Sequence, residues 1–182
     1  MSQNSYDTKI VENLLQKENH IRGLAKDLNI NQMTISRRIN DLYKENVVDF
    51  RQEGKNKVYF IKKTLEARQY AYIAEIRKVL EAIKKYPLLR GIIESISKKN
   101  KIKLAIIFGS YAKGKATKES DIDLYIETKD RKLKEEIAKI NSKLNVKIGL
   151  YDRQSLLVKE IEKNHLLIKG TEEYYEKTKF FE

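Results

Sequence analysis

Hydrophobic residues in the first sixty positions recur at the three-to-four-residue spacing of amphipathic helices. Three such groups are Ile10, Val11, Leu14 and Leu15; Ile21, Leu24, Ala25 and Leu28; and Ile35, Ile39 and Leu42. Asn31 precedes the third group and is predicted to cap its helix. Two apolar runs, 47–50 and 58–61, then flank a polar turn containing Gly54, which predicts a β-hairpin. Residues 1–63 are therefore expected to form a compact unit of three helices and a hairpin.

A single long helix is predicted over 64–86, ended by Pro87, the only proline of the chain. Ile73, Ile76, Leu80 and Ile83 are spaced like a short heptad seam, which packs either on the chain's own domains or on a second copy. Residues 88–182 alternate between the three-to-four-residue spacing of helices and the apolar runs or two-residue alternation of strands. Strands are predicted at 102–108, 121–127 and 146–151, and helices at 88–96, 131–144, 153–163 and 171–181. The expected fold class is α+β, with domains at 1–63 and 88–182 joined by a linker helix at 64–87.

Composition narrows the function classes. The chain has 182 residues and no cysteine, which excludes disulfides and thiolate chemistry. Its formal net charge of +12, from 38 basic and 26 acidic residues, favours a polyanionic partner such as nucleic acid. No apolar run reaches the ~18 residues of a membrane span, and the start lacks the apolar core of a signal peptide. We expect a cytoplasmic protein with no membrane partner.

Residues 24–39 (LAKDLNINQMTISRRI) carry short polar and basic side chains on a predicted third helix. A helix in the major groove needs such groups for base edges and cations for phosphates. The three helices and hairpin resemble the winged helix-turn-helix family, which implies binding to double-stranded DNA, often as a homodimer. The candidate DNA-contacting residues on the third helix and the hairpin are Gln32, Thr34, Ser36, Arg37, Arg38, Lys55 and Lys57.

Residues 106–126 (IIFGSYAKGKATKESDIDLYI) combine two features that suit a phosphorylated ligand. An apolar strand ends in Gly109-Ser110 and passes directly into a helical turn, whose free N–H groups favour an anion. Asp121 and Asp123 lie two apart on the next strand and so share a face. Two neighbouring carboxylates suit a cation such as Mg²⁺ bridging to a triphosphate.

This stretch resembles the minimal nucleotidyltransferases of the DNA polymerase beta superfamily over about 88–151. The resemblance implies that Gly109 and Ser110 bind the phosphates of ATP or another NTP, and that Asp121 and Asp123 are the catalytic, Mg²⁺-binding pair. Lys113 is expected to neutralise phosphate charge. The family carries a third carboxylate on the following strand, and the alternation of 146–151 predicts Gly149 in its place. Losing that group is expected to slow transfer by about 10²–10⁴-fold.

These features favour a DNA-binding transcriptional regulator whose C-terminal domain binds a Mg²⁺-nucleotide with weak or no transfer. The alternative is an active enzyme that transfers a nucleoside monophosphate to a hydroxyl of a protein, as antitoxin-like relatives do, of a small molecule or of RNA. A third interpretation is a structural platform in which the winged helix alone functions.

Overall fold

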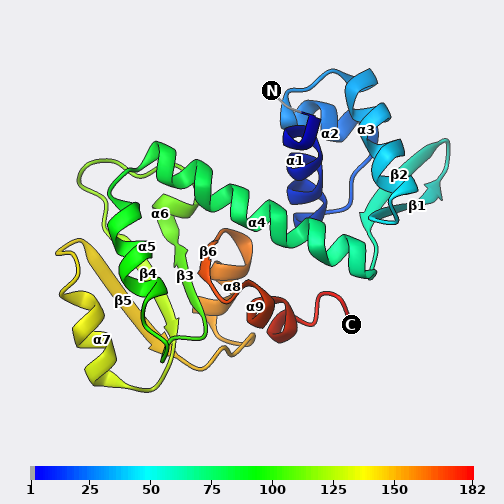
Figure 1. Ribbon diagram of the computed structural model, residues 1–182. Helices are drawn as coiled ribbons and strands as arrows, with labels where there is room; N and C mark the ends of the chain where they lie inside the picture. The colour runs from blue at the N-terminus through cyan, green and yellow to red at the C-terminus, as the bar shows by residue number, and fades with distance from the viewer. Residues whose placement is uncertain (1–2) are drawn as a thin grey trace. The chain divides into compact units, whose positions relative to one another are not determined.

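A computed structural model describes residues 3–182 (Figure 1). The chain folds into two compact units. Unit 1 consists of the residues up to Arg77 together with the C-terminal Phe180–Glu182, and unit 2 consists of Lys78–Lys179. Helix α4 (Leu65–Lys85) continues from the first unit into the second. In the described residues, no helix combines the length and apolar composition needed to cross a membrane.

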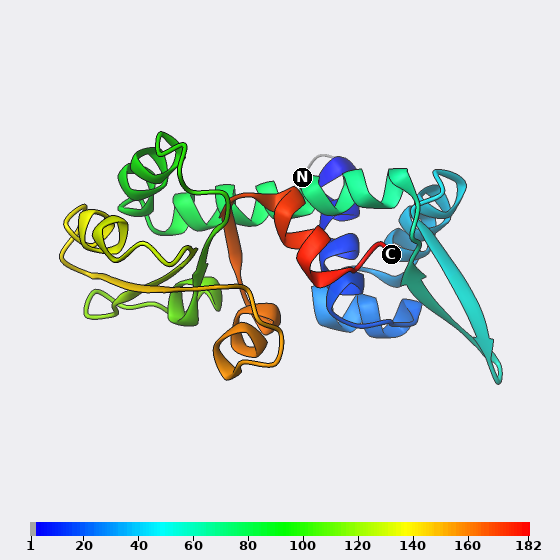
Figure 2. The same cartoon turned by 90° about the horizontal axis from the view of Figure 1, so that it is seen from below.

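Unit 1 contains the three helices and the hairpin expected from the sequence: α1 (Gln3–Gln16), α2 (Ile21–Leu28), α3 (Gln32–Lys44), β1 (Val48–Glu53) and β2 (Asn56–Ile61). The side chain of Asn31 caps α3 by accepting a hydrogen bond from Met33 N at 2.8 Å, as predicted. Ile10, Leu24 and Ile35 are fully buried where the three helices meet. The antiparallel hairpin extends away from the helices, as Figure 2 shows, so its tip is free to contact a ligand.

Helix α4 buries a stripe of small residues and exposes larger ones. Ala67 and Ala71 are fully buried, whereas Ile73, Ile76 and Leu80 are each about half exposed. Ile83 of the predicted seam packs against the core of unit 2. Three of the four seam residues thus keep about half of their surface exposed, and the fourth is packed.

Unit 2 is a four-stranded mixed sheet in the order β5-β4-β3-β6, surrounded by helices. Its elements are α5 (Leu89–Ser97), β3 (Ala105–Phe108), α6 (Gly109–Ala112), β4 (Ile122–Glu127), α7 (Arg131–Ala138), β5 (Leu144–Gly149), α8 (Leu156–Lys163), β6 (Leu166–Lys169) and α9 (Thr171–Thr178). Strand β3 is antiparallel to β4 and β6, and β4 is parallel to β5. Ile122, Leu124 and Ile126 point into a core that α5 and α7 cover, which turns the alternate residues of β4 to the other face.

Two expectations for unit 2 are corrected. The helix predicted over 131–144 ends at Ala138, because the segment that follows turns at Asn141 and starts β5 at Leu144. Strand β6 was not expected, yet it forms the sheet edge beside β3. The expected mixed α+β class is confirmed.

Candidate functional sites

Gly109 forms the bend between β3 and α6. Its φ of 69° lies in the left-handed region, which favours glycine. A Cβ added there would lie 2.4 Å from Asp123 Oδ2, closer than any real contact. The backbone of the bend therefore lies next to the Asp123 carboxylate, and a larger residue at 109 would displace that carboxylate.

The two aspartates lie at the start of β4. Asp121 is exposed and immediately precedes the strand, whereas Asp123 is half-buried and pairs across the sheet with Phe108, the residue before the bend. Burial raises the pKa of the Tyr111 phenol on α6, and the charges of Tyr86 and Asp121 raise it further, so Asp121 acts on the same short helix. In the described chain, neither aspartate forms an ion pair with a basic side chain. The structure thus brings the acids and the Gly-Ser bend together.

Two other candidate phosphate ligands lie on or beside α6. Ser110 is half-buried in the first turn of the helix. Lys113 follows the helix, is exposed, and places its Nζ 3.4 Å from Glu160 Oε1 on α8. Exposed pairs of this kind contribute little stability, so Lys113 remains available to an incoming anion.

The residue beside Asp123 on β5 is Asn145, not Gly149. The parallel register pairs Asp123 with Asn145 and Glu127 with Gly149, four residues further along the strands. Asn145 Nδ2 donates a hydrogen bond to Asp123 Oδ1 at 2.8 Å. The prediction for Gly149 was wrong because alternation identifies the face of a strand but not its register.

Nearby carboxylates do not complete the acidic pair. Glu127 forms an ion pair with Lys177 Nζ at 3.0 Å and accepts a hydrogen bond from Tyr151 N. Asp152 is exposed and accepts from Gln154 N. No group of three or more His, Cys, Asp or Glu side chains with metal-binding geometry occurs among the residues described. The oxygens of Asp121 and Asp123 still suit a single Mg²⁺, which commonly takes only one or two protein carboxylates together with substrate phosphates.

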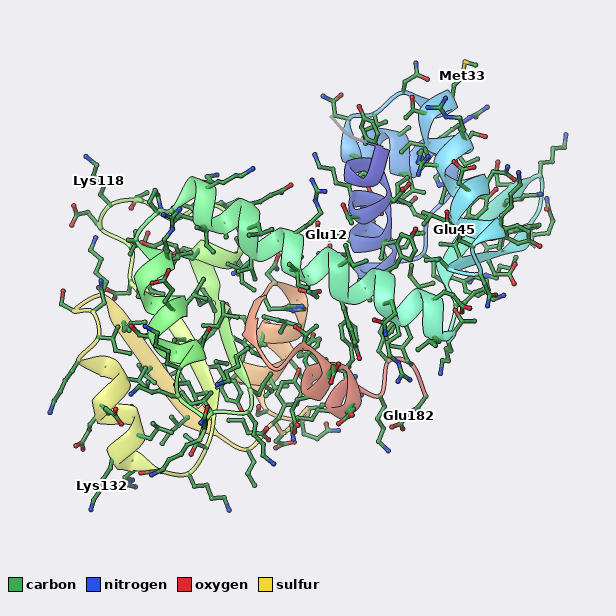
Figure 3. All side chains as sticks on the ribbon, viewed as in Figure 1. Glu12, Met33, Glu45, Lys118, Lys132 and Glu182 are labelled. Atoms are coloured by element: carbon green, nitrogen blue, oxygen red, sulfur yellow. The ribbon has the colours of Figure 1, made fainter. Side chains whose placement is uncertain are left out.

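In unit 1, most of the candidate DNA-contacting side chains of α3 lie on its outer surface. Gln32, Ser36 and Arg37 are exposed, and Thr34 is half-buried. Ile35 and Ile39 are buried on the opposite face, as expected. Met33, which sequence reasoning did not select, is 83% exposed and projects from the start of α3 (Figure 3).

Arg38 is removed from the candidate DNA-contacting set. Its side chain is 12% exposed, and its guanidinium forms two hydrogen bonds with the Asp7 carboxylate of α1 and a third, at 2.9 Å, with Asp41. The hydrogen bonds with Asp7, together with the negative charges of Asp7 and Asp41, outweigh burial and raise the pKa of Arg38 above its ordinary value. The arginine joins α1 to α3, and each nitrogen of its guanidinium already donates to a carboxylate within unit 1.

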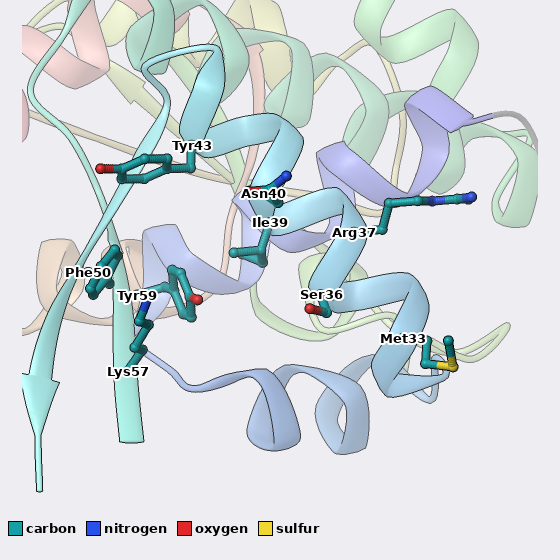
Figure 4. A pocket seen from close by; sticks show the side chains of 9 residues that line it. All are labelled: Met33, Ser36, Arg37, Ile39, Asn40, Tyr43, Phe50, Lys57 and Tyr59. Atoms are coloured by element: carbon teal, nitrogen blue, oxygen red, sulfur yellow. The ribbon is translucent and has the colours of Figure 1, made fainter. Parts of the chain in front are cut away.

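A groove of about 660 Å³ lies between α3 and the hairpin (Figure 4). Ser36, Asn40 and Tyr43 line its helix side, and Phe50 and Lys57 line its hairpin side. Lys57 Nζ lies 3.9 Å from the centre of the Phe50 ring, so this lysine packs along the groove wall. Lys55 is exposed at the hairpin tip.

Asn40 and Tyr43 were missed by sequence reasoning, although a helical pattern could have found them. They follow Ser36 by four and seven residues, which places all three on one helix face.

Comparisons with known proteins agree with this geometry at a coarse level. Residues 90–174 match the family model described as "Polymerase beta, Nucleotidyltransferase". This segment contains the Gly-Ser bend, both aspartates and Asn145, which supports the expected resemblance to nucleotidyltransferases. No curated protein matches the chain.

Among solved structures, the chain is similar to the homodimeric winged helix-turn-helix DNA-binding domain of Mb0332 from Mycobacterium bovis, a possible ArsR-family transcriptional regulator. The sequence identity is 22%, the alignment covers 44% of this chain and 71% of that chain, and the TM-score is 0.35. Because this likeness is so distant, the interpretation of unit 1 depends on its own helices, hairpin and groove.

Proposed function

We propose that the protein is a DNA-binding regulator whose unit 2 binds a Mg²⁺-nucleotide. The observation that carries the nucleotide site is the contact of the Gly109 backbone with the Asp123 carboxylate, beside Asp121. A phosphate at the bend would meet main-chain N–H groups and the Ser110 hydroxyl, while the two carboxylates would hold the cation. When bound, Mg²⁺ neutralises phosphate charge and fixes the orientation of the triphosphate.

The DNA-binding part of the proposal is supported by the outer face of α3 and by the hairpin. Arg37, Lys55 and Lys57 are exposed cations, and Gln32 and Ser36 are exposed hydrogen-bonding groups. Cations of this kind supply affinity for phosphates, and polar groups at the start of a helix read base edges.

Helix α4 offers a physical connection between the two ligands. Its Ala67 and Ala71 are buried, and its Val79 and Ile83 pack against the core of unit 2. If the nucleotide and DNA prefer different states of this helix, or the same one, binding of either ligand changes the affinity for the other. The factor is the same in both directions.

Two titrations of the full chain test the proposal. Calorimetry with a non-hydrolysable ATP analogue and Mg²⁺ should show binding that is lost in Asp121→Asn/Asp123→Asn and kept in Asp152→Asn, an exposed carboxylate outside the site. Fluorescence anisotropy on a duplex should then show different DNA affinity with and without Mg²⁺-ATP. No heat of binding would exclude the nucleotide site, and equal DNA affinity would exclude the coupling.

The family match favours a second function, transfer of a nucleoside monophosphate to a hydroxyl of a protein, small molecule or RNA. The acceptor oxygen would bond to the α-phosphorus, pyrophosphate would leave, and the hydroxyl proton would pass to water. Asn145 beside Asp123 cannot accept the hydroxyl proton as a carboxylate would, so slow turnover is expected. Incubation with labelled ATP and candidate acceptors tests this, since label transfer should vanish in Asp121→Asn/Asp123→Asn.

A further inference from the structure

Asn145 places an uncharged amide against the acidic pair. It lies directly across the parallel register from Asp123, is half-buried, and donates from Nδ2 to Asp123 Oδ1 at 2.8 Å. Rotating the amide by 180° would turn its oxygen toward the carboxylate and replace attraction by repulsion, so the donor orientation is the stable one. The other carboxylate oxygen, Oδ2, faces the Gly109 backbone.

The hydrogen bond fixes Asp123 without a cation. In an acidic site built from three carboxylates, the negative charges repel one another until metal ions bind. Here the amide dipole offsets part of the charge on Asp123, which keeps the carboxylate in position in the free protein. Lys147 follows two residues later on the same face of β5 and is exposed, so it adds a positive charge along this side of the sheet.

We propose that Asn145 is a positioning residue that limits the site to one divalent cation, bound by Asp121 and Asp123. This inference rests on the proposed nucleotide site. A second cation would need a further anionic ligand beside Asp123, and the amide occupies that place. Asparagine at 145 thereby favours nucleotide binding over transfer, because it orients the carboxylate that holds Mg²⁺-phosphate and supplies no base.

The experiment is a titration of the full chain with Mn²⁺ alone, in which paramagnetic resonance measures free Mn²⁺. The wild-type protein should bind one equivalent and Asn145→Asp two. Asn100→Asp is the matched control, since Asn100 is an exposed turn residue preceding the opposite end of β3 from Gly109, and it should still bind one. Asn145→Ala removes the hydrogen bond without adding charge. It should bind one equivalent with affinity lowered about 10–100-fold, the usual effect of losing a residue that orients a ligand.

Thermal unfolding gives a second measurement. Without metal, Asn145→Asp should melt below both the wild type and Asn100→Asp, and Mn²⁺ should raise its melting temperature more than theirs, because only this variant adds a third carboxylate directly beside Asp123. Two equivalents bound by the wild type, or one by a folded Asn145→Asp, would overturn the inference and leave the nucleotide site intact. If the wild type binds no Mn²⁺ either alone or with ATP, both this inference and the proposed nucleotide site are overturned. If Asn145→Asp does not fold with or without Mn²⁺, unchanged affinity in Asn145→Ala refutes the positioning role.

Discussion

Adjacent arginines on α3 are expected to respond to mutation in opposite ways. Arg38 is 12% exposed and holds Asp7, which is 6% exposed, whereas Arg37 projects into solvent. Arg38→Ala leaves the Asp7 carboxylate buried without its cation. Removing one partner of a buried ion pair typically costs about 3–5 kcal/mol. Since a small domain is stable by only about 5–15 kcal/mol, this is a large part of the stability of unit 1.

Hydrogen exchange of the amides in α1 and α3 measures this loss within unit 1. Arg38→Ala should speed their exchange by about 10²–10⁴-fold, whereas Arg37→Ala should change the free energy of the exchange-competent opening by no more than about 0.5 kcal/mol. In duplex binding, Arg37→Ala should lower the slope of log affinity against log salt concentration by about one phosphate contact. The assignment of Arg38 would be refuted if Arg38→Ala kept wild-type exchange rates but lost DNA affinity.

Three further perturbations test other parts of the structure. Gly109→Ala should lose about 1–2 kcal/mol for its left-handed backbone and weaken nucleotide binding in calorimetry by displacing Asp123, whereas Gly91→Ala, in open space on α5, should do neither. Lys55→Gln/Lys57→Gln should lower the salt slope of duplex binding by about two, and an unchanged slope would exclude the hairpin from the interface. Burial and a hydrogen bond to Glu45 raise the pKa of Tyr70 to about 12, so the folded state keeps a proton that the unfolded state releases near pH 10. Stability should therefore fall as the pH rises from 10 to 12, and less so in Tyr70→Phe, in urea unfolding followed by circular dichroism.

The elements of unit 1 could be predicted because each has a single clear periodicity and a recognisable boundary. Asn31 marks the start of α3, and Gly54 marks the hairpin turn. Strand β6 could not be predicted in the same way, because its four residues are too few to distinguish a strand from a helix by periodicity. Its pairing with β3 depends on residues about sixty positions earlier in the chain.

The roles of single side chains in the sites also depend on distant residues that local periodicity does not reveal. Arg37 and Arg38 are chemically identical in the sequence, and only the position of Asp7 on another helix distinguishes them. Alternation along 146–151 places Lys147 and Gly149 on one face, and the structure extends this face back to Asn145, which lies before the predicted strand. Which of them meets Asp123 depends on the length of the connection through α7, since that connection sets the parallel register.

The Gly-Ser bend and the aspartates are brought together by one antiparallel pairing, that of β3 with β4. Phe108 lies opposite Asp123, so the residue after β3 necessarily falls beside the carboxylate near the start of β4. A shift of this register by two residues would keep every core residue on its face and yet move the bend about 7 Å from Asp123. Hydrophobic burial alone therefore does not specify the site. Glycine at 109 fits the observed register, because a Cβ at that position would collide with the Asp123 carboxylate.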